Sequence, residues 1–152
     1  MSNIPTNPID AVGTWMSTAG QLARGDKLTS FSIGMMCEEF AETLAAVGGV
    51  DDLLILSLKD LGTKFKEDRH DISGMDKTEF LDGVIDTAWT SIGALHAITE
   101  SPLLAFDEVT RSNFSKFVRN GDGEIVAILD ANGKVIKGEH FFRPNLKQFV
   151  GG

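Results

Sequence analysis

The sequence predicts an all-α protein, a bundle of four or five helices followed by a small C-terminal β-hairpin. Apolar residues recur at helical spacing through the first 118 residues, and alternating, β-branched residues follow them. The 152 residues, 42% hydrophobic and 24% charged, are enough for one globular core. We therefore expect a single domain over 1–152, with a loose lead-in over 1–8, a helical core over 9–118 and a hairpin and tail over 119–152.

The first half of the helical core should hold three helices. The first covers 9–22, where apolar residues form one stripe before a Gly-Asp break. The second starts at Ser30 or Ser32, either of which could cap it, and ends at Val47 before a glycine pair. The third covers 53–65. The inner face of the second helix is expected to consist of Ile33, Met36, Phe40, Leu44 and Val47.

The second half should add two helices. A polar loop over 70–76 precedes a helix over 77–98, in which Trp89 is expected to lie in the core. Ser101 followed by proline is typical of a helix start, and this fifth helix should continue to about Val118.

The chain after this helix predicts a hairpin. Residues 124–129 and 134–137 are alternating or β-branched, and Asp130-Ala131-Asn132-Gly133 between them is a turn signal. The tail over 141–149 should be irregular.

Composition excludes several classes of protein. A membrane-spanning helix needs about 18 consecutive apolar residues or more, and no such run is present. The first nine residues lack the basic and apolar regions of a secretory signal, and the lone Cys37 cannot form an internal disulfide, so a cytoplasmic location is expected.

The charge distribution argues against a nucleic-acid partner. The formal charge is −8, and non-specific nucleic-acid binding relies on Lys and Arg to neutralise phosphates. The charge is uneven: residues 1–110 hold 7 basic and 18 acidic side chains, whereas residues 111–152 hold 7 basic and 4 acidic ones. This asymmetry suggests a metal ion on the acidic part and a small anion on the basic part.

Two helices carry clusters of carboxylates at i,i+3 and i,i+4 spacing. These are Glu38, Glu39 and Glu42 in the second helix and Glu79, Asp82 and Asp86 in the fourth. Like charges at such spacing cost about 0.2–0.5 kcal/mol per pair, and neither cluster has a basic residue three or four positions away. If the helices pack antiparallel, the carboxylates could converge, and they would then need a cation to remain ionised.

Oxygen ligands without Cys or His suit a hard ion such as Mg²⁺ or Mn²⁺. A solvated acidic face remains the alternative. A di-iron site is disfavoured because it needs two Glu-x-x-His pairs, and the sequence holds only one, Glu67 to His70.

The same acidic strings resemble a known family. Glu38-Glu39-Phe40-Ala41-Glu42 and Asp82-Gly83-Val84-Ile85-Asp86 resemble the metal-binding motifs of the all-α nucleoside triphosphate pyrophosphohydrolases, which include MazG, the dimeric dUTPases and phosphoribosyl-ATP pyrophosphohydrolase. The usual motif has Glu where this chain has Gly83. Asp82 takes that role, and Glu79 offers an alternative one turn earlier.

Two later segments are similar to the small, phage-type MazG-like proteins. Glu108 to Lys116 reads EVTRSNFSK, similar to their EVhxSNxSK stretch. Gly133 to Gly138, followed by Phe141-Phe142-Arg143-Pro144, is similar to their GKxxKGxxYxxP tail. The resemblance covers residues 9–147.

The resemblance implies an activity and an assembly. The activity is hydrolysis of a nucleoside or deoxynucleoside triphosphate to the monophosphate and pyrophosphate, with Mg²⁺ as cofactor and Mn²⁺ as a possible substitute. A phage enzyme of this kind could shape the dNTP pool through dGTP or dUTP, in the host cytoplasm. The assembly is a homodimer or a homotetramer.

The resemblance also assigns roles to residues. Glu39, Glu42, Asp82 and Asp86 would bind the metal, and Glu38 would act in catalysis by orienting the attacking water or by binding a second metal.

The basic quarter and one tryptophan would bind the substrate. Lys116 and Lys137 are expected to contact phosphate oxygens and Asn113 the sugar or phosphate, with Arg143 nearby and Trp15 stacking on the base. Arg111 is instead expected to pair with Asp107, four residues before it. The competing hypothesis is a non-catalytic helical module that senses a nucleotide or binds a partner.

Overall fold

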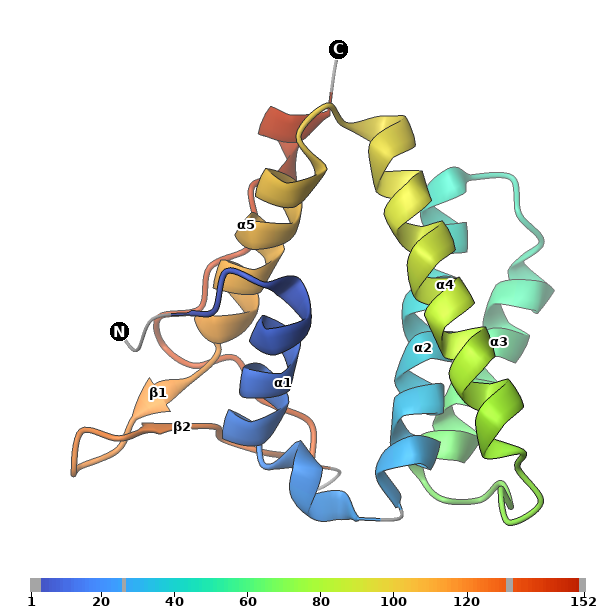
Figure 1. Cartoon of the computed structure of the whole chain (residues 1–152), viewed down its shortest axis with the longest axis horizontal. Coiled ribbons are helices and arrows are strands. Elements are labelled where there is room, and N and C mark those ends of the chain that lie inside the picture. The colour runs from blue at the N-terminus through green and yellow to red at the C-terminus, as the bar shows by residue number, and fades with distance from the viewer. Residues whose placement is uncertain (1–3, 26, 131–132, 151–152) are drawn as a thin grey trace. The chain divides into compact units, whose positions relative to one another are not determined.

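The structure is a computed structural model that describes residues 4–25, 27–130 and 133–150, and it is mostly helical (Figure 1). The described elements are α1 (Pro8–Thr18), η1 (Gln21–Arg24), α2 (Lys27–Val47), α3 (Asp52–Lys66), α4 (Lys77–Ile98), α5 (Pro102–Phe114), β1 (Val118–Arg119), β2 (Ile125–Val126) and η2 (Leu146–Phe149). The all-α character with a small sheet is confirmed, whereas the type of bundle stays a prediction.

The chain divides into two compact units, which are described separately. Leu22–Met75 forms one unit, and the residues up to Gln21 form the other with those from Asp76 onward. The expectation of a single domain stays a prediction.

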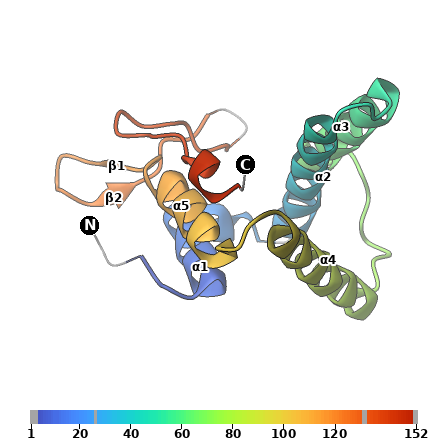
Figure 2. The same cartoon turned by 90° about the horizontal axis from the view of Figure 1, so that it is seen from above.

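The unit Leu22–Met75 is a helical hairpin in which α2 and α3 lie side by side (Figures 1 and 2). The helices approach most closely at two glycines. A Cβ on Gly34 would lie 2.6 Å from the carbonyl oxygen of Gly62. Near this crossing, the buried Ser30 donates a hydrogen bond from its Oγ to the Phe65 carbonyl at 2.8 Å. Close backbone contact, rather than large apolar side chains, therefore joins the two helices.

This packing corrects two expectations for α2. The expected inner stripe does not face α3, since Phe40 is 56% and Val47 is 72% exposed. The helix also begins at Lys27, before either serine expected as its cap. The hydroxyl of Ser30 bonds to α3 instead, so this serine is an interior packing residue. The buried residues of α2 are Ser30, Phe31, Gly34 and Ala41.

The other unit has its core between α1 and the segment after α5. Ala19, Phe117 and Val135 are buried together. The partly buried residues packed against them are Trp15, Phe114, Ile125 and Ala127. The fifth helix starts as expected after Ser101, although that side chain makes no capping hydrogen bond. It ends at Phe114 rather than at Val118, because Val118 pairs in β1.

The small sheet differs from the expected hairpin. Val118–Arg119 pairs antiparallel with Ile125–Val126, and the Asn120 side chain accepts hydrogen bonds from backbone N–H groups within the turn. The expected pairing of 124–129 with 134–137 is reduced to one bridge, Leu129 with Val135. Two residues of the expected turn, 131 and 132, lie outside the described residues.

Helix α4 has the expected bounds, and Asp76 caps it by accepting a hydrogen bond from the Thr78 N–H at 2.9 Å. No residue of α4 is buried, and Trp89, expected in the core, is 77% exposed. In the parts of the chain that the structure describes, no helix is both long and apolar enough to cross a membrane.

Candidate functional site

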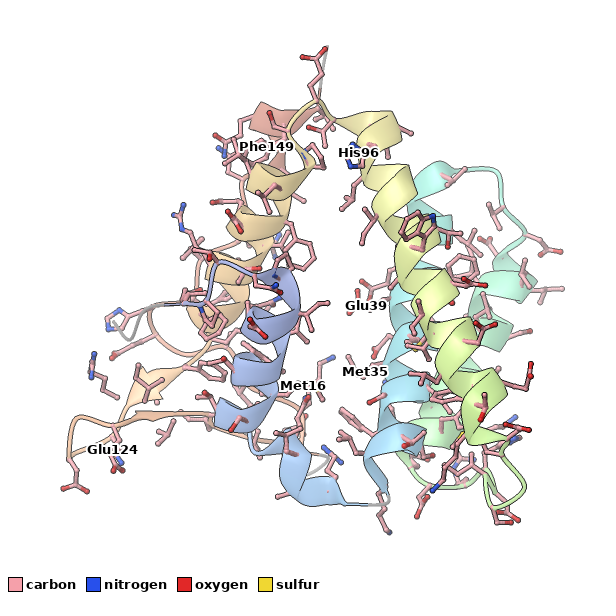
Figure 3. The ribbon with its side chains drawn as sticks, viewed as in Figure 1. Met16, Met35, Glu39, His96, Glu124 and Phe149 are labelled. Atoms are coloured by element: carbon pink, nitrogen blue, oxygen red, sulfur yellow. The ribbon has the colours of Figure 1, made fainter. Side chains whose placement is uncertain are left out.

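The three carboxylates of α2 fall into two environments. Glu39 and Glu42 are exposed, one turn apart at i,i+3 spacing. Figure 3 shows the Glu39 and Met35 side chains on the same side of α2, turned away from α3. Glu38 is on the edge nearer α3, where its Oε2 lies 2.8 Å from Lys66 Nζ. The helix therefore presents one ion-paired and two exposed carboxylates.

Lys66 is a partner of the site that the sequence did not predict. Its side chain and that of Glu38 are each 24% exposed, so the ion pair is partly shielded from water. Lys66 ends α3 and passes Gly34, where a Cβ would be 2.6 Å from its Cγ. Gly34 and Gly62 are the sequence signal that could have revealed this partner. Their contact fixes the antiparallel register of α2 and α3, which brings Lys66 to Glu38.

The carboxylates of α4 are exposed. Asp82 and Asp86 lie one turn apart on this helix. The alternative ligand, Glu79, lies one turn before Asp82. Since α2 and α4 belong to different units, convergence of the two carboxylate sets stays a prediction.

The donor set of each helix is chemically suited to a hard cation. Exposed carboxylates one turn apart offer oxygen ligands with the charge that Mg²⁺ requires. Within residues 4–25, 27–130 and 133–150, no group of three or more His, Cys, Asp or Glu side chains is arranged to hold a metal ion. A metal site therefore stays a prediction.

Three of the residues expected to bind substrate are in direct contact. The Trp15 Nε1–H donates to the Asn113 carbonyl at 3.0 Å, and Lys116 Nζ donates to Asn113 Oδ1 at 2.8 Å. Lys116 Nζ also lies 5.9 Å from the centre of the Trp15 ring. Residues nearly a hundred positions apart thus form one polar, cationic cluster.

The tail brings the backbone of a second lysine beside Lys116. The Gly138 N–H donates to the Lys116 carbonyl at 3.0 Å, so the Lys137 backbone lies beside that of Lys116. The Lys137 side chain is exposed, with its Nζ 4.8 Å from the centre of the Phe141 ring. Arg143 is exposed on the same tail.

Trp15 has a structural role as well. Its ring stacks on the buried Phe117 with centroids 5.6 Å apart, which attaches α1 to the segment after α5. Stacking of this ring on a base stays a prediction.

The expected pairing of Arg111 is wrong. Arg111 Nη1 lies 3.3 Å from Glu108 Oε2, at i,i+3 spacing, rather than beside Asp107. Glu108 is buried while Asp107 is exposed, so Glu108 is the carboxylate in the less hydrated environment.

Comparison of the chain with protein-family models, curated proteins and solved structures finds no match. The family resemblance therefore stays a prediction that depends on the quoted motifs.

Proposed function

We propose that the protein hydrolyses a nucleoside or deoxynucleoside triphosphate to the monophosphate and pyrophosphate with the help of a divalent cation. The observation that supports this most is the contact between the Lys116 and Lys137 segments, joined by the Gly138–Lys116 hydrogen bond. Lys116, with Asn113 and the Trp15 ring next to it, and Lys137, whose backbone is adjacent, would offer a polyphosphate two cationic side chains and its base an aromatic ring.

The carboxylates would supply the cation site. In this proposal Glu39 and Glu42 of α2 act with Asp82 and Asp86 of α4, and Glu79 is the alternative to Asp82. Mg²⁺, or Mn²⁺ in its place, would offset the charge of the triphosphate and make an attacking water more acidic.

The chain's own residues would direct the reaction. The water oxygen would form a bond to the α-phosphorus while the bond between that phosphorus and the α–β bridging oxygen breaks, so that pyrophosphate leaves and the proton of the water passes to solvent. Glu38, held by Lys66, would accept a hydrogen bond from this water and orient it. Lys116, Lys137 and Arg143 would hold the charged phosphate oxygens.

Pyrophosphate release from each of the eight common nucleotides, with and without Mg²⁺, tests this function. Glu39→Gln and Asp86→Asn should each reduce release at least a hundredfold, because each removes one charged ligand. Glu67→Gln is a matched control, since this exposed glutamate pairs with Arg69 and is none of the proposed ligands. Unchanged release in both Glu39→Gln and Asp86→Asn would rule out the metal assignment.

A nucleotide sensor is the second candidate. The cluster of Lys116, Asn113 and Trp15 lies within one unit, so it could bind a nucleotide without hydrolysing it. Binding by calorimetry without pyrophosphate release would favour this function.

We also propose that the protein is a homo-oligomer. Leu81, Ile85, Trp89 and Ile92 follow helical spacing on α4 and are between 53% and 77% exposed. An exposed apolar stripe of this length favours burial against a second copy of the chain. Sedimentation velocity should therefore give a mass of at least two chains, whereas a concentration-independent monomer would contradict the proposal.

A further inference from the structure

The tail after the sheet lies beside α5 (Figures 1 and 2). Hydrogen bonds attach it at three places to α5 and the residues directly after that helix. Gly138 bonds to the Lys116 carbonyl, as described above. Phe142 makes two bonds: its carbonyl accepts from Ser112 Oγ at 2.8 Å, and its N–H donates to Ser115 Oγ at 3.1 Å. The tail contacts successive turns of α5 in reverse order, and is therefore antiparallel to the helix.

The third attachment is made by Glu108. Its Oε1 accepts a hydrogen bond from the Asn145 N–H at 2.9 Å, and its Oε2 faces Arg111 at 3.3 Å. The Glu108 side chain is only 10% exposed, although a carboxylate is costly to bury without partners. Beyond this point η2, with Phe149 labelled in Figure 3, lies against α5.

Two of the attached positions are adjacent to basic residues of the tail. Lys137 precedes the anchored Gly138, and Arg143 follows the anchored Phe142. Glycine is required at 138, because a Cβ there would lie 2.6 Å from Val118 Cγ1 and 2.8 Å from the Lys116 carbonyl oxygen. The hydrogen bonds that attach the tail thus fix the backbone positions of Lys137 and Arg143.

We propose that Glu108 and Ser112 are positioning residues, which hold Lys137 and Arg143 in place to bind the phosphates of a nucleotide. This inference rests on the proposed function, because it assigns these two basic residues to that substrate. Neither Glu108 nor Ser112 would contact the nucleotide. They would act through the tail backbone, by lowering the entropy that Lys137 and Arg143 lose when they bind.

Hydrogen exchange tests the attachment independently of any activity. Glu108→Leu and Ser112→Ala should each raise the exchange rate of the amides at 142 and 145 at least tenfold, with the helical far-UV signal unchanged. Glu108→Gln keeps an oxygen that can accept from the Asn145 N–H and should remain within about threefold of wild type. Asp107→Asn, at an exposed neighbouring carboxylate, is the control. Unaltered exchange in both Glu108→Leu and Ser112→Ala would overturn the inference.

A double-mutant cycle tests the positioning role. The probe is a non-hydrolysable deoxynucleoside triphosphate analogue, and calorimetry gives its dissociation constant. Glu108→Leu should weaken binding about tenfold in the wild-type background, because mobile basic side chains must be ordered on binding. In a chain that already carries Lys137→Ala and Arg143→Ala, the same change should weaken binding less than twofold.

The two failures are distinguishable. A tenfold loss that persists without Lys137 and Arg143 would overturn the positioning role, since Glu108 would then act by another route. If the wild-type protein binds no analogue while exchange shows the tail attached, the proposed function fails and the positioning role fails with it. If the wild-type protein binds the analogue but Glu108→Leu binds it equally well, only the positioning role fails.

Discussion

Replacing Gly34 with alanine tests the packing of α2 on α3. The added Cβ would meet the Gly62 carbonyl oxygen and Lys66 Cγ at 2.6 Å each, and the Lys66 backbone nitrogen at 2.9 Å. Side-chain carbons essentially never approach other heavy atoms this closely. Two of the three atoms belong to the backbone of α3, so rotation of a side chain cannot relieve the contact, and the helices must separate.

Two opposing effects decide the magnitude. Alanine is favoured over glycine in a helix interior by about 1 kcal/mol. Overpacking of a close contact costs about 1–3 kcal/mol, and the separation of α2 from α3 also weakens the Ser30–Phe65 hydrogen bond. We therefore expect Gly34→Ala to lower the free energy of unfolding by about 1–2 kcal/mol.

Urea unfolding followed by circular dichroism measures this change. With a slope of about 2 kcal/mol per molar urea, the midpoint should fall by about 0.5–1 M. Gly13→Ala is the matched control, because no atom lies within 4 Å of its added Cβ, and it should raise stability by about 0.5–1 kcal/mol. If Gly34→Ala stabilises as much as Gly13→Ala, the glycine crossing of the two helices is refuted.

Three further predictions follow from the ion pairs and the exposed helix. Lys66→Met removes the partly shielded ion pair with Glu38, so urea unfolding should show a loss of about 1–3 kcal/mol and pyrophosphate release should fall about tenfold. Lys66→Arg should restore most of both, and wild-type values for Lys66→Met would contradict the role of the pair. Trp89→Lys, at a 77% exposed position, should reduce the sedimenting mass towards one chain, and an unchanged mass would place the interface elsewhere. The hydrogen bond from Lys64 lowers the pKa of Asp60, so Lys64→Met should raise this pKa in an NMR titration. Because the pKa is depressed in the folded state, the pair stabilises the fold at a pH above the unfolded-state pKa. This stabilisation is lost as the pH falls through the folded-state pKa.

The helices were predicted best where local chemistry alone determines them. Helix α4 begins after Asp76, whose side chain caps it, and ends at Ile98 as expected. The bounds of α3 were nearly right for the same reason, since Asp51 caps that helix by accepting from the Leu53 N–H at 2.8 Å. Caps are local contacts, and a sequence pattern records them directly.

Packing was predicted less well because periodicity records only which side chains are apolar. The stripe through Phe40 on α2 suggested the buried face, but helices can approach more closely through Gly34 and Gly62 than through large side chains. The sequence-based interpretation therefore placed Phe40 and Val47 of α2 and Trp89 of α4 in the core, whereas these side chains are exposed.

The functional residues divide in the same way. Asn113 and Lys116 are three positions apart, a spacing that a local pattern records, and their side chains are hydrogen-bonded. The roles of Glu108 and Ser112 depend on tail residues 37 and 30 positions away, which no local pattern contains. Long-range backbone contacts of this kind require the structure.

Hydrolysis in ¹⁸O-labelled water tests the central claim, that water attacks the α-phosphorus of a nucleoside triphosphate. With Mg²⁺ and a nucleotide that the protein hydrolyses, mass spectrometry should find the ¹⁸O label in the monophosphate, whereas the pyrophosphate should carry no label. Chelation of the metal should stop the reaction. Label in pyrophosphate or in free phosphate, or no hydrolysis of any of the eight nucleotides, would contradict the claim.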